Sequence, residues 1–221
     1  MKQKILAVLF DFDGTLVDSE QYYMLCGVQS MVEAGIDREA ATQFYREKIS
    51  GVRSDLKPAL FAQAFPQLDY QAYDARYQSR CDQWRLEKPI VAKPGANELL
   101  HNLKARGYKL ALVTMSTYEE VQQVCQQTGL DFSVFDCYCG GSGCAAKPDP
   151  GVYLAAMQAL GVTPEQTMVV EDSNVGALAA INAGATTVVV KDQSVLSDEV
   201  LAKADQIFEM NQIAKVQTLL K

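Results

Sequence analysis

Residues 4–15 read KILAVLFDFDGT, a short apolar run that ends in two aspartates and a glycine. The six successive apolar residues at 5–10 are too few for an ordinary helix, and they are typical of a strand buried on both faces of a sheet. Asp11 and Asp13 follow directly, and Gly14 supplies a turn that can bring both carboxylates toward one pocket. The sequence therefore predicts a buried strand at about 4–10 with a polar loop at its carboxyl end.

From Pro94 onward, helical and strand patterns alternate along the chain. Helices are expected at about 95–106, 117–128, 150–161 and 174–183. Asp149 is the expected N-cap of the third helix, with Pro150 in its first turn. Strands are expected at 109–113, 167–170 and 186–190, with a weak last strand near 206–208. This alternation is typical of a doubly wound parallel sheet with helices on both faces, which is an α/β fold.

Residues 17–90 break the alternation. Their apolar periodicity predicts helices at about 20–34, 38–48, 54–64 and 69–86, and no convincing strand. A helical insert after the first strand is the simplest interpretation. We therefore expect an α/β domain made of residues 1–16 and 91–221, and a separate helical domain at 17–90.

The composition and net charge of the chain exclude some classes of binding partner. The 221 residues include 20 basic and 27 acidic side chains, a net charge of −7, and no Lys/Arg-rich run. Neither nucleic acid nor an anionic membrane surface is therefore an expected partner. The apolar run at 5–10 is too short for a signal sequence or a membrane span, so we expect a cytoplasmic protein, by default a monomer. Cys137, Cys139 and Cys144 lack the spacing of common zinc sites, and we expect reduced thiols.

Polar residues stand at the ends of the expected strands or in the loops near them. They are Asp11 and Asp13 after the first strand, Thr114 after the strand at 109–113, Lys147 before the helix at 150, and Glu171 and Asp172 after the strand at 167–170. Ligands of open parallel sheets bind beyond the carboxyl ends of the strands, so we expect these side chains to share one pocket. Their chemical types suit phosphoryl transfer.

Two neighbouring aspartates can divide the work of phosphate ester hydrolysis. Asp11 can attack phosphorus to form an acyl phosphate, while Asp13 protonates the leaving oxygen and then deprotonates water. Thr114 and Lys147 offer a hydroxyl and an ammonium to the non-bridging phosphoryl oxygens. Because carboxylates repel a phosphate dianion, the site needs a hard divalent cation, and Mg²⁺ suits these oxygen ligands. Asp172, backed by Glu171, is the natural further ligand.

Each of these residues also has a simpler explanation. Aspartate and glycine are common in turns, and a lysine before a proline is usually a solvated loop residue. Ser116 or Thr117 with Glu119 or Glu120 forms a capping box, and Asp172 could merely cap the helix at 174. All these residues occur together at or near successive strand ends along the chain, and this combination favours a phosphoryl-transfer site over a separate explanation for each residue.

With these residues in this order, the chain resembles the haloacid dehalogenase superfamily over essentially its whole length, and within it the helical-cap phosphatases and the β-phosphoglucomutase-like proteins. The motifs that match are Asp11-Phe12-Asp13-Gly14-Thr15-Leu16, Leu112-Val113-Thr114, Lys147-Pro148-Asp149-Pro150, and Val170-Glu171-Asp172-Ser173 with Gly176. The resemblance implies a Rossmann-like core with an inserted helical cap and a Mg²⁺-dependent phosphatase. It implies that Asp11 is the nucleophile and Asp13 the general acid and base, that Thr114 and Lys147 bind phosphate, and that Asp11, the carbonyl of Asp13 and Asp172, with Glu171 in support, hold the metal.

Two departures and one loose match bear on the substrate. Hydrolytic dehalogenases of this superfamily lack the second aspartate, whereas this chain keeps Asp13, so a carbon–halogen substrate is disfavoured. Tyr23 stands where β-phosphoglucomutases carry a histidine, which leaves a phosphatase ahead of a sugar-phosphate mutase. A non-catalytic binding protein on the same fold is a third hypothesis. Arg53 falls near a substrate-contacting cap arginine of related enzymes, and a surface arginine is the alternative explanation. Sugar phosphates are the first substrate class that the resemblance implies.

Overall fold

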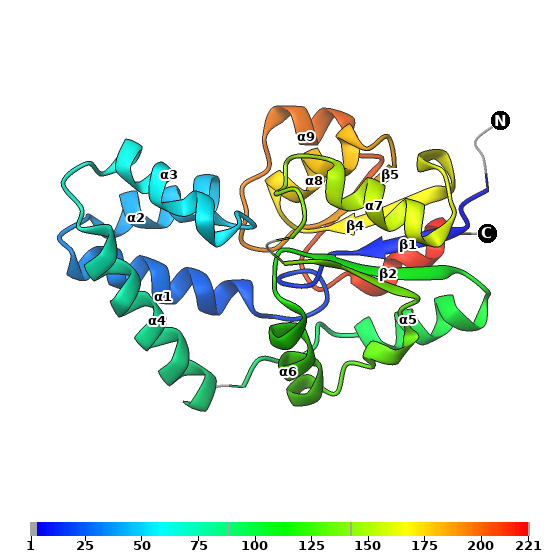
Figure 1. The fold of residues 1–221 in the computed structure, drawn as a ribbon, viewed down its shortest axis with the longest axis horizontal. Coiled ribbons are helices and arrows are strands. Elements are labelled where there is room, and N and C mark those ends of the chain that lie inside the picture. Colours follow the sequence, from blue (N-terminus) through cyan, green and yellow to red (C-terminus); the bar gives the residue numbers. More distant parts are fainter. Residues whose placement is uncertain (1–3, 88, 142, 221) are drawn as a thin grey trace.

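The computed structural model describes residues 4–87, 89–141 and 143–220, and its centre is one parallel sheet (Figure 1). The strands are β1 (Ala7–Phe10), β2 (Lys109–Thr114), β3 (Cys137–Gly140), β4 (Thr167–Glu171), β5 (Thr186–Val190) and β6 (Gln206–Phe208). They lie in the order β3-β2-β1-β4-β5-β6, and every neighbouring pair is parallel. The chain builds one half of the sheet from β1 to β3 and then continues with β4 on the other side of β1. The strand order therefore reverses between β1 and β4, and α/β sheets bind ligands at such a point.

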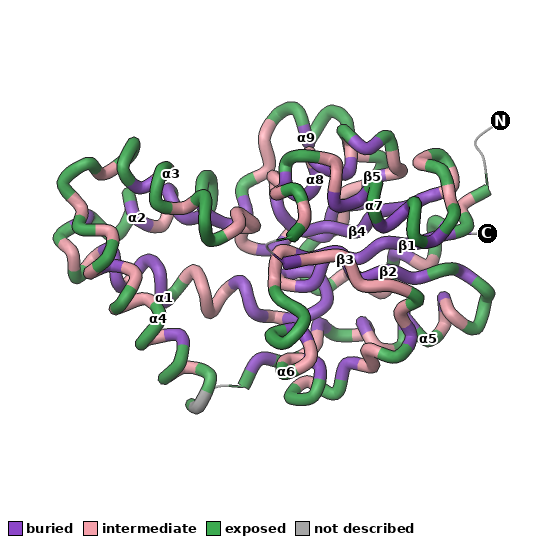
Figure 2. The backbone as a smooth tube through the Cα atoms, in the orientation of Figure 1, coloured by how far each residue is buried: buried purple, intermediate pink, exposed green. Residues whose placement is uncertain are grey.

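Helices cover both faces of the sheet, as the sequence predicted. One face packs against α5 (Ala96–Ala105) and α6 (Tyr118–Thr128), and the other against α7 (Gly151–Leu160) and α8 (Asn174–Asn182). All four residues of β1 are fully buried, which explains the unbroken apolar run of the sequence (Figure 2). The remaining helix beside the sheet is α9 (Asp198–Lys203), and short 3₁₀ turns cover Phe132–Val134, Pro164–Gln166 and Ile213–Leu219.

The residues between β1 and α5 form a helical segment beyond the carboxyl ends of the strands, at the left of Figure 1. It contains α1 (Glu20–Glu33), α2 (Arg38–Phe44), a π-helical turn (Tyr45–Ile49), a 3₁₀ turn (Ser54–Leu56), α3 (Lys57–Ala64) and α4 (Tyr70–Glu87). Met31, Phe44 and Phe61 belong to an apolar cluster confined to this segment. The segment therefore has a core separate from the cores that flank the sheet.

The two linkers of the helical segment pair with each other. Asp18 N donates to Val91 O over 2.8 Å, and Lys93 N donates to Leu16 O over 2.8 Å. The buried Lys93 ammonium bridges Asp18 at 2.9 Å and Asp192 at 3.1 Å. Because Asp192 follows β5, this bridge anchors both linkers to the sheet.

Three details differ from the sequence-based expectations. The short edge strand β3 and the six-residue helix α9 were not expected, because β3 is only half-buried and α9 buries a single residue, Val200. Pro150, rather than Asp149, is the N-cap of α7, and Asp149 Oδ1 accepts a hydrogen bond from Gly151 N instead. Over the described residues, no helix combines the length and the apolar character needed to cross a membrane.

Candidate active site

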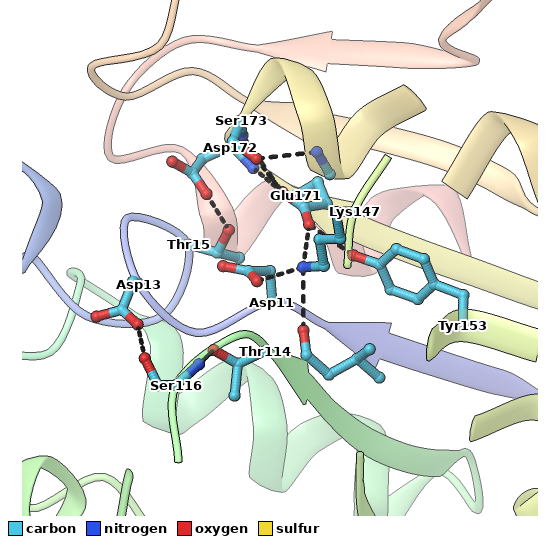
Figure 3. Close-up of polar contacts among 12 residues, drawn as sticks. Asp11, Asp13, Thr15, Thr114, Ser116, Lys147, Tyr153, Glu171, Asp172 and Ser173 are labelled. Carbon is cyan, nitrogen blue, oxygen red and sulfur yellow. Dashed lines mark hydrogen bonds and ion pairs between the residues drawn. The ribbon is translucent and has the colours of Figure 1, made fainter. Parts of the chain in front are cut away.

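The carboxyl ends of β1, β2 and β4 open into a cavity that the helical segment covers. Its volume is about 250 Å³. The predicted residues Asp11, Asp13, Thr114, Lys147 and Asp172 line it from the sheet side, and Arg53 lines it from the helical segment. Glu171 is fully buried and does not line the cavity itself; it lies behind Lys147, which it contacts (Figure 3). The structure therefore brings all the sequence-predicted site residues to one place.

Lys147 is the electrostatic centre of the site. Its Nζ donates to Asp11 Oδ1 at 2.6 Å, to Glu171 Oε1 at 2.5 Å and to the carbonyl of Val113 at 3.2 Å. Burial alone would lower the pKa of Lys147, but the carboxylates of Asp11 and Glu171 outweigh it and raise that pKa. The lysine is therefore held charged, with its three N–H groups directed at three different partners.

Glu171 has little capacity left for a further ligand. Its Oε1 accepts from Lys147 and from the Tyr153 hydroxyl at 2.6 Å. Its Oε2 accepts from the backbone N–H groups of Asp172 and Ser173, and from Ser173 Oγ at 3.1 Å. A side chain at Gly176 would overlap this carboxylate, which explains the glycine of that motif. Glu171 thus fits a supporting position behind a metal site better than a direct ligand.

Asp11 and Asp172 are the carboxylates that face open space. Oxygens of Asp11, Glu171 and Asp172 all lie within 4.8 Å of one another. Burial raises the pKa of Asp11 well above its usual range despite the opposing charge of Lys147. Burial and the charge of Asp11 raise the pKa of Asp172 in the same way. Such crowding of buried carboxylates is relieved by a bound cation, so the donor set fits a hard divalent metal ion.

Asp13 is held apart from this group by two hydroxyls. Its Oδ1 accepts from Ser19 Oγ at 2.6 Å, and its Oδ2 accepts from Ser116 Oγ at 2.5 Å. Burial raises its pKa, and these two hydrogen bonds lower it in part. A carboxyl group in a water-poor pocket with a raised pKa can hold a proton at a pH where an exposed aspartate is ionised, as a general acid must.

Thr114 and Arg53 have different environments. Thr114 Oγ1 accepts from Ser116 N at 3.1 Å, so its own proton is available for a ligand in the cavity. Arg53 is engaged by Asp55 through two N–H groups, at 2.6 and 2.8 Å, and its NH1 donates to the carbonyl of Cys144 at 2.6 Å. Its guanidinium therefore links the helical segment to the loop before Lys147, and little of it is left for a substrate.

Sequence reasoning missed several partners of these residues. Ser116 was considered for the capping box, but that box is formed by Thr117 and Glu120, which leaves Ser116 free to bind Asp13. Tyr153 belongs to a mostly apolar helix, where a tyrosine looks like an ordinary core residue. Thr15 Oγ1 donates to Asp172 Oδ1 at 2.9 Å. These two residues are 157 positions apart in the sequence, so no local sequence pattern predicts their contact. A polar side chain on an apolar helix face is the one usable signal among these.

Metal binding should stabilise the protein in a pH-dependent way. At a Mg²⁺ concentration about 100 times the Kd, the gain in unfolding free energy is about 2.7 kcal/mol, or roughly 5–10 °C in melting temperature. The pKa values of Asp11 and Asp172 are raised in the metal-free protein, so the carboxyl groups gain protons as the pH falls, and protons compete with the metal. The gain should therefore be smaller at pH 5.5 than at pH 7.5. Thermal unfolding with Mg²⁺ or EDTA checks this, and Asp172→Asn should abolish the gain; an equal gain at both pH values or in the variant would contradict it.

Comparison with known proteins agrees with this geometry. The family model of the haloacid dehalogenase-like hydrolases matches residues 5–184. The chain is 34% identical to an uncharacterised protein encoded in the fgs 3′ region of Lacticaseibacillus casei, over 83% of each chain. It is 29% identical to a phosphorylated carbohydrates phosphatase of Thermotoga maritima, over 80% of this chain and 81% of the other. A crystal structure of CbbY from Rhodobacter sphaeroides in complex with xylulose-(1,5)bisphosphate superposes with a TM-score of 0.74, at 25% identity and over 96% of both chains. The chain belongs to the haloacid dehalogenase-like hydrolase family.

Proposed function

We propose that this protein is a Mg²⁺-dependent phosphatase that hydrolyses a small phosphomonoester, in the first instance a sugar phosphate, through an aspartyl-phosphate on Asp11. The observation that supports it most is the environment of Asp11. One of its oxygens is fixed by Lys147 at 2.6 Å, and Oδ2 makes no hydrogen bond within the described part of the chain. A buried carboxylate that is oriented by one oxygen and open at the other is placed to act as a nucleophile.

The residues divide the reaction into two steps. In the first, Asp11 Oδ2 forms a bond to phosphorus, the ester bond breaks, and Asp13 gives its proton to the leaving oxygen. In the second, Asp13 takes a proton from water, whose oxygen attacks phosphorus and releases Asp11 and inorganic phosphate. Thr114 donates to a non-bridging oxygen during both steps, and the Lys147 ammonium beside Asp11 binds the phosphoryl group by exchanging one of its present partners for a non-bridging oxygen.

The metal is assigned to the same carboxylates. Asp11, the backbone carbonyl of Asp13 and Asp172 would hold Mg²⁺, with Glu171 in support. When bound, the ion supplies positive charge that offsets the repulsion between the carboxylates and a phosphate dianion. The crowding of Asp11 and Asp172 supports this assignment, since burial and the nearby carboxylates raise the pKa of both groups and a bound cation would offset that rise.

The substrate class rests on the size of the site and on the relatives. A cavity of about 250 Å³ is slightly smaller than most small-molecule sites, which begin at roughly 300 Å³, and so favours a compact ligand. The relative from Thermotoga maritima is named for phosphorylated carbohydrates, and the CbbY structure contains a sugar bisphosphate.

We assign residues 1–16 and 91–221 to a catalytic core and 17–90 to a cap that closes the site, in a cytoplasmic, monomeric enzyme.

Phosphate release tests the proposal. Wild-type protein should release inorganic phosphate from p-nitrophenyl phosphate and from members of a panel of hexose, pentose and gluconate phosphates, and EDTA should stop the release. A folded, Mg²⁺-binding protein that releases phosphate from no ester would overturn the proposal. In that case a mutase assay primed with a sugar bisphosphate would decide whether the same site transfers phosphate to a second hydroxyl.

A further inference from the structure

Two charged side chains of the helical segment face the cavity and have no part in the chemistry proposed above. Glu20 is the first residue of α1, and Lys57 is the first residue of α3. Both line the cavity, and both belong to the helical segment rather than to the sheet. Their charges are therefore available to the part of a substrate that is not the transferred phosphate.

Glu20 carries a buried oxygen that lacks a partner. Its side chain belongs to a residue that is only 6% exposed, and among the described residues nothing donates a hydrogen bond to Oε1. Burial raises the pKa of this carboxyl to about 7, and the charge of Lys57 partly opposes the rise. Buried polar atoms in native structures are nearly always hydrogen-bonded, so an acceptor left open beside a ligand cavity points to a donor supplied by the ligand.

Lys57 interacts with the charge of Glu20 but forms no close ion pair in the part of the chain that the structure describes. Its Nζ lies 5.9 Å from the centre of the Tyr77 ring, and no aspartate or glutamate in the part of the chain that the structure describes forms an ion pair with it. The other cationic side chains that reach the cavity from the helical segment are paired: Arg53 with Asp55, and Arg85 with Asp82 at 3.1 Å. Among these three cations of the helical segment, Lys57 is thus the one without a close ion pair, and its ammonium is the best placed to meet an anionic group of a ligand.

We propose that Glu20 and Lys57 form a subsite that recognises the carbon skeleton of the substrate, Glu20 by accepting a hydrogen bond from a hydroxyl group and Lys57 by binding a second anionic group, a carboxylate or a second phosphate. The inference rests on the proposed phosphatase function and narrows it to phosphorylated polyols that carry a second negative charge. Asp11, Asp13 and Asp172 disfavour such a charge beside the catalytic residues, whereas Lys57 offers it a position at the helical segment.

Three linear six-carbon esters separate the two contacts. Hexyl phosphate has neither feature, sorbitol 6-phosphate adds hydroxyl groups, and 6-phosphogluconate adds a carboxylate to these. Wild-type protein should prefer 6-phosphogluconate over sorbitol 6-phosphate by about tenfold in kcat/KM, the order of magnitude of one charge-assisted contact. Lys57→Met should bring that ratio close to one. Lys48→Met removes an exposed lysine of the same segment that does not line the cavity, and should keep the wild-type ratio.

The hydroxyl contact is tested in the same series. Wild-type protein should prefer sorbitol 6-phosphate over hexyl phosphate, and Glu20→Met should lose this preference, because a methionine has nearly the same length and no strong acceptor. Glu47→Met, which changes an exposed glutamate of the same segment, serves as the matched control. Circular dichroism and melting temperature establish that each variant is folded, so a changed ratio cannot be attributed to unfolding.

Binding separates failure of the subsite from failure of the phosphatase. The dissociation constants of the three esters with Asp11→Asn protein, measured by calorimetry in the presence of Mg²⁺, do not depend on turnover. If no ester is hydrolysed but the binding preference follows Lys57, the phosphatase proposal fails and the subsite stands. If esters are hydrolysed while the preference for 6-phosphogluconate is absent, or is equal in Lys57→Met and Lys48→Met, the subsite is refuted and the phosphatase stands.

Discussion

Asp11→Asn is expected to lower the rate of phosphate release by at least about 10³-fold, the scale of losing a covalent nucleophile. The amide nitrogen and oxygen have nearly the same shape as the carboxylate, but the amide cannot form the acyl phosphate. Burial raises the pKa of Asp11, so a neutral residue at this position suits the metal-free fold at least as well as the charged one. The variant should therefore melt no lower than wild type in the presence of EDTA.

The measurement is the initial rate of phosphate release at saturating substrate and Mg²⁺. Asp198→Asn, an identical change at an exposed position of α9, is the control and should behave as wild type. A folded Asp11→Asn protein that keeps more than about a tenth of the wild-type rate would show that another group attacks phosphorus, since loss of a nucleophile costs far more.

Lys147→Met is expected to destabilise the protein by about 3–5 kcal/mol at pH 8, in addition to lowering activity by about 10²–10³-fold. The ammonium lies within 2.6 Å of Asp11 and 2.5 Å of Glu171, and none of these residues is more than 8% exposed. Removing the cation leaves two buried carboxylates facing each other. The methionine fills a similar volume, so lost packing is a small part of the effect.

The loss of stability should depend on pH with a definite sign. The pKa of Asp11 is already raised above its unfolded value, so its contribution to stability is greatest below that value and is lost as the pH rises through the folded pKa. Without Lys147 the folded pKa of Asp11 rises further, so the loss of stability continues to a higher pH than in wild type, whereas at low pH protonation of the carboxyl relieves it. Urea unfolding at pH 8 and pH 5.5 should show a smaller difference from wild type at pH 5.5.

A surface lysine provides the control for this experiment. Lys104 pairs with Asp136 at 2.6 Å, but both side chains are more than one-third exposed. Lys104→Met should therefore cost no more than about 1 kcal/mol at either pH. A Lys147→Met protein that is as stable as Lys104→Met at pH 8 would contradict the electrostatic account of the site.

The parallel sheet could be predicted because its central strands are buried on both faces. Residues 5–10, 110–113 and 188–190 are continuous apolar runs, and the helices between them have clear end signals, such as Gly129 and Gly161 in left-handed conformations. The edge strand β3 has no such signal: its residues Cys137–Gly140 are half-buried and mixed in character. Sequence pattern therefore predicts the buried interior of this fold better than its periphery.

The site could be predicted only as far as its residues stand at strand ends. Asp11 and Asp172 come to one pocket because their strands are parallel neighbours, which the alternation of helices and strands already implied. The use of Lys147 to hold Glu171, and the open oxygen of Glu20, depend on how segments distant in sequence pack. The residues that support the site from behind, and those that face the substrate, could therefore be identified only from the structure.

The most direct test of the account is to look for phosphate on Asp11. The protein is mixed with p-nitrophenyl phosphate and Mg²⁺, quenched in acid during steady turnover, digested at low pH, and its peptides are analysed by mass spectrometry. The account predicts one added phosphoryl group on the peptide that contains Asp11, located on that residue and absent without Mg²⁺. A phosphoryl group found on another residue, or full turnover with Asp11 unmodified at every quench time, would contradict it.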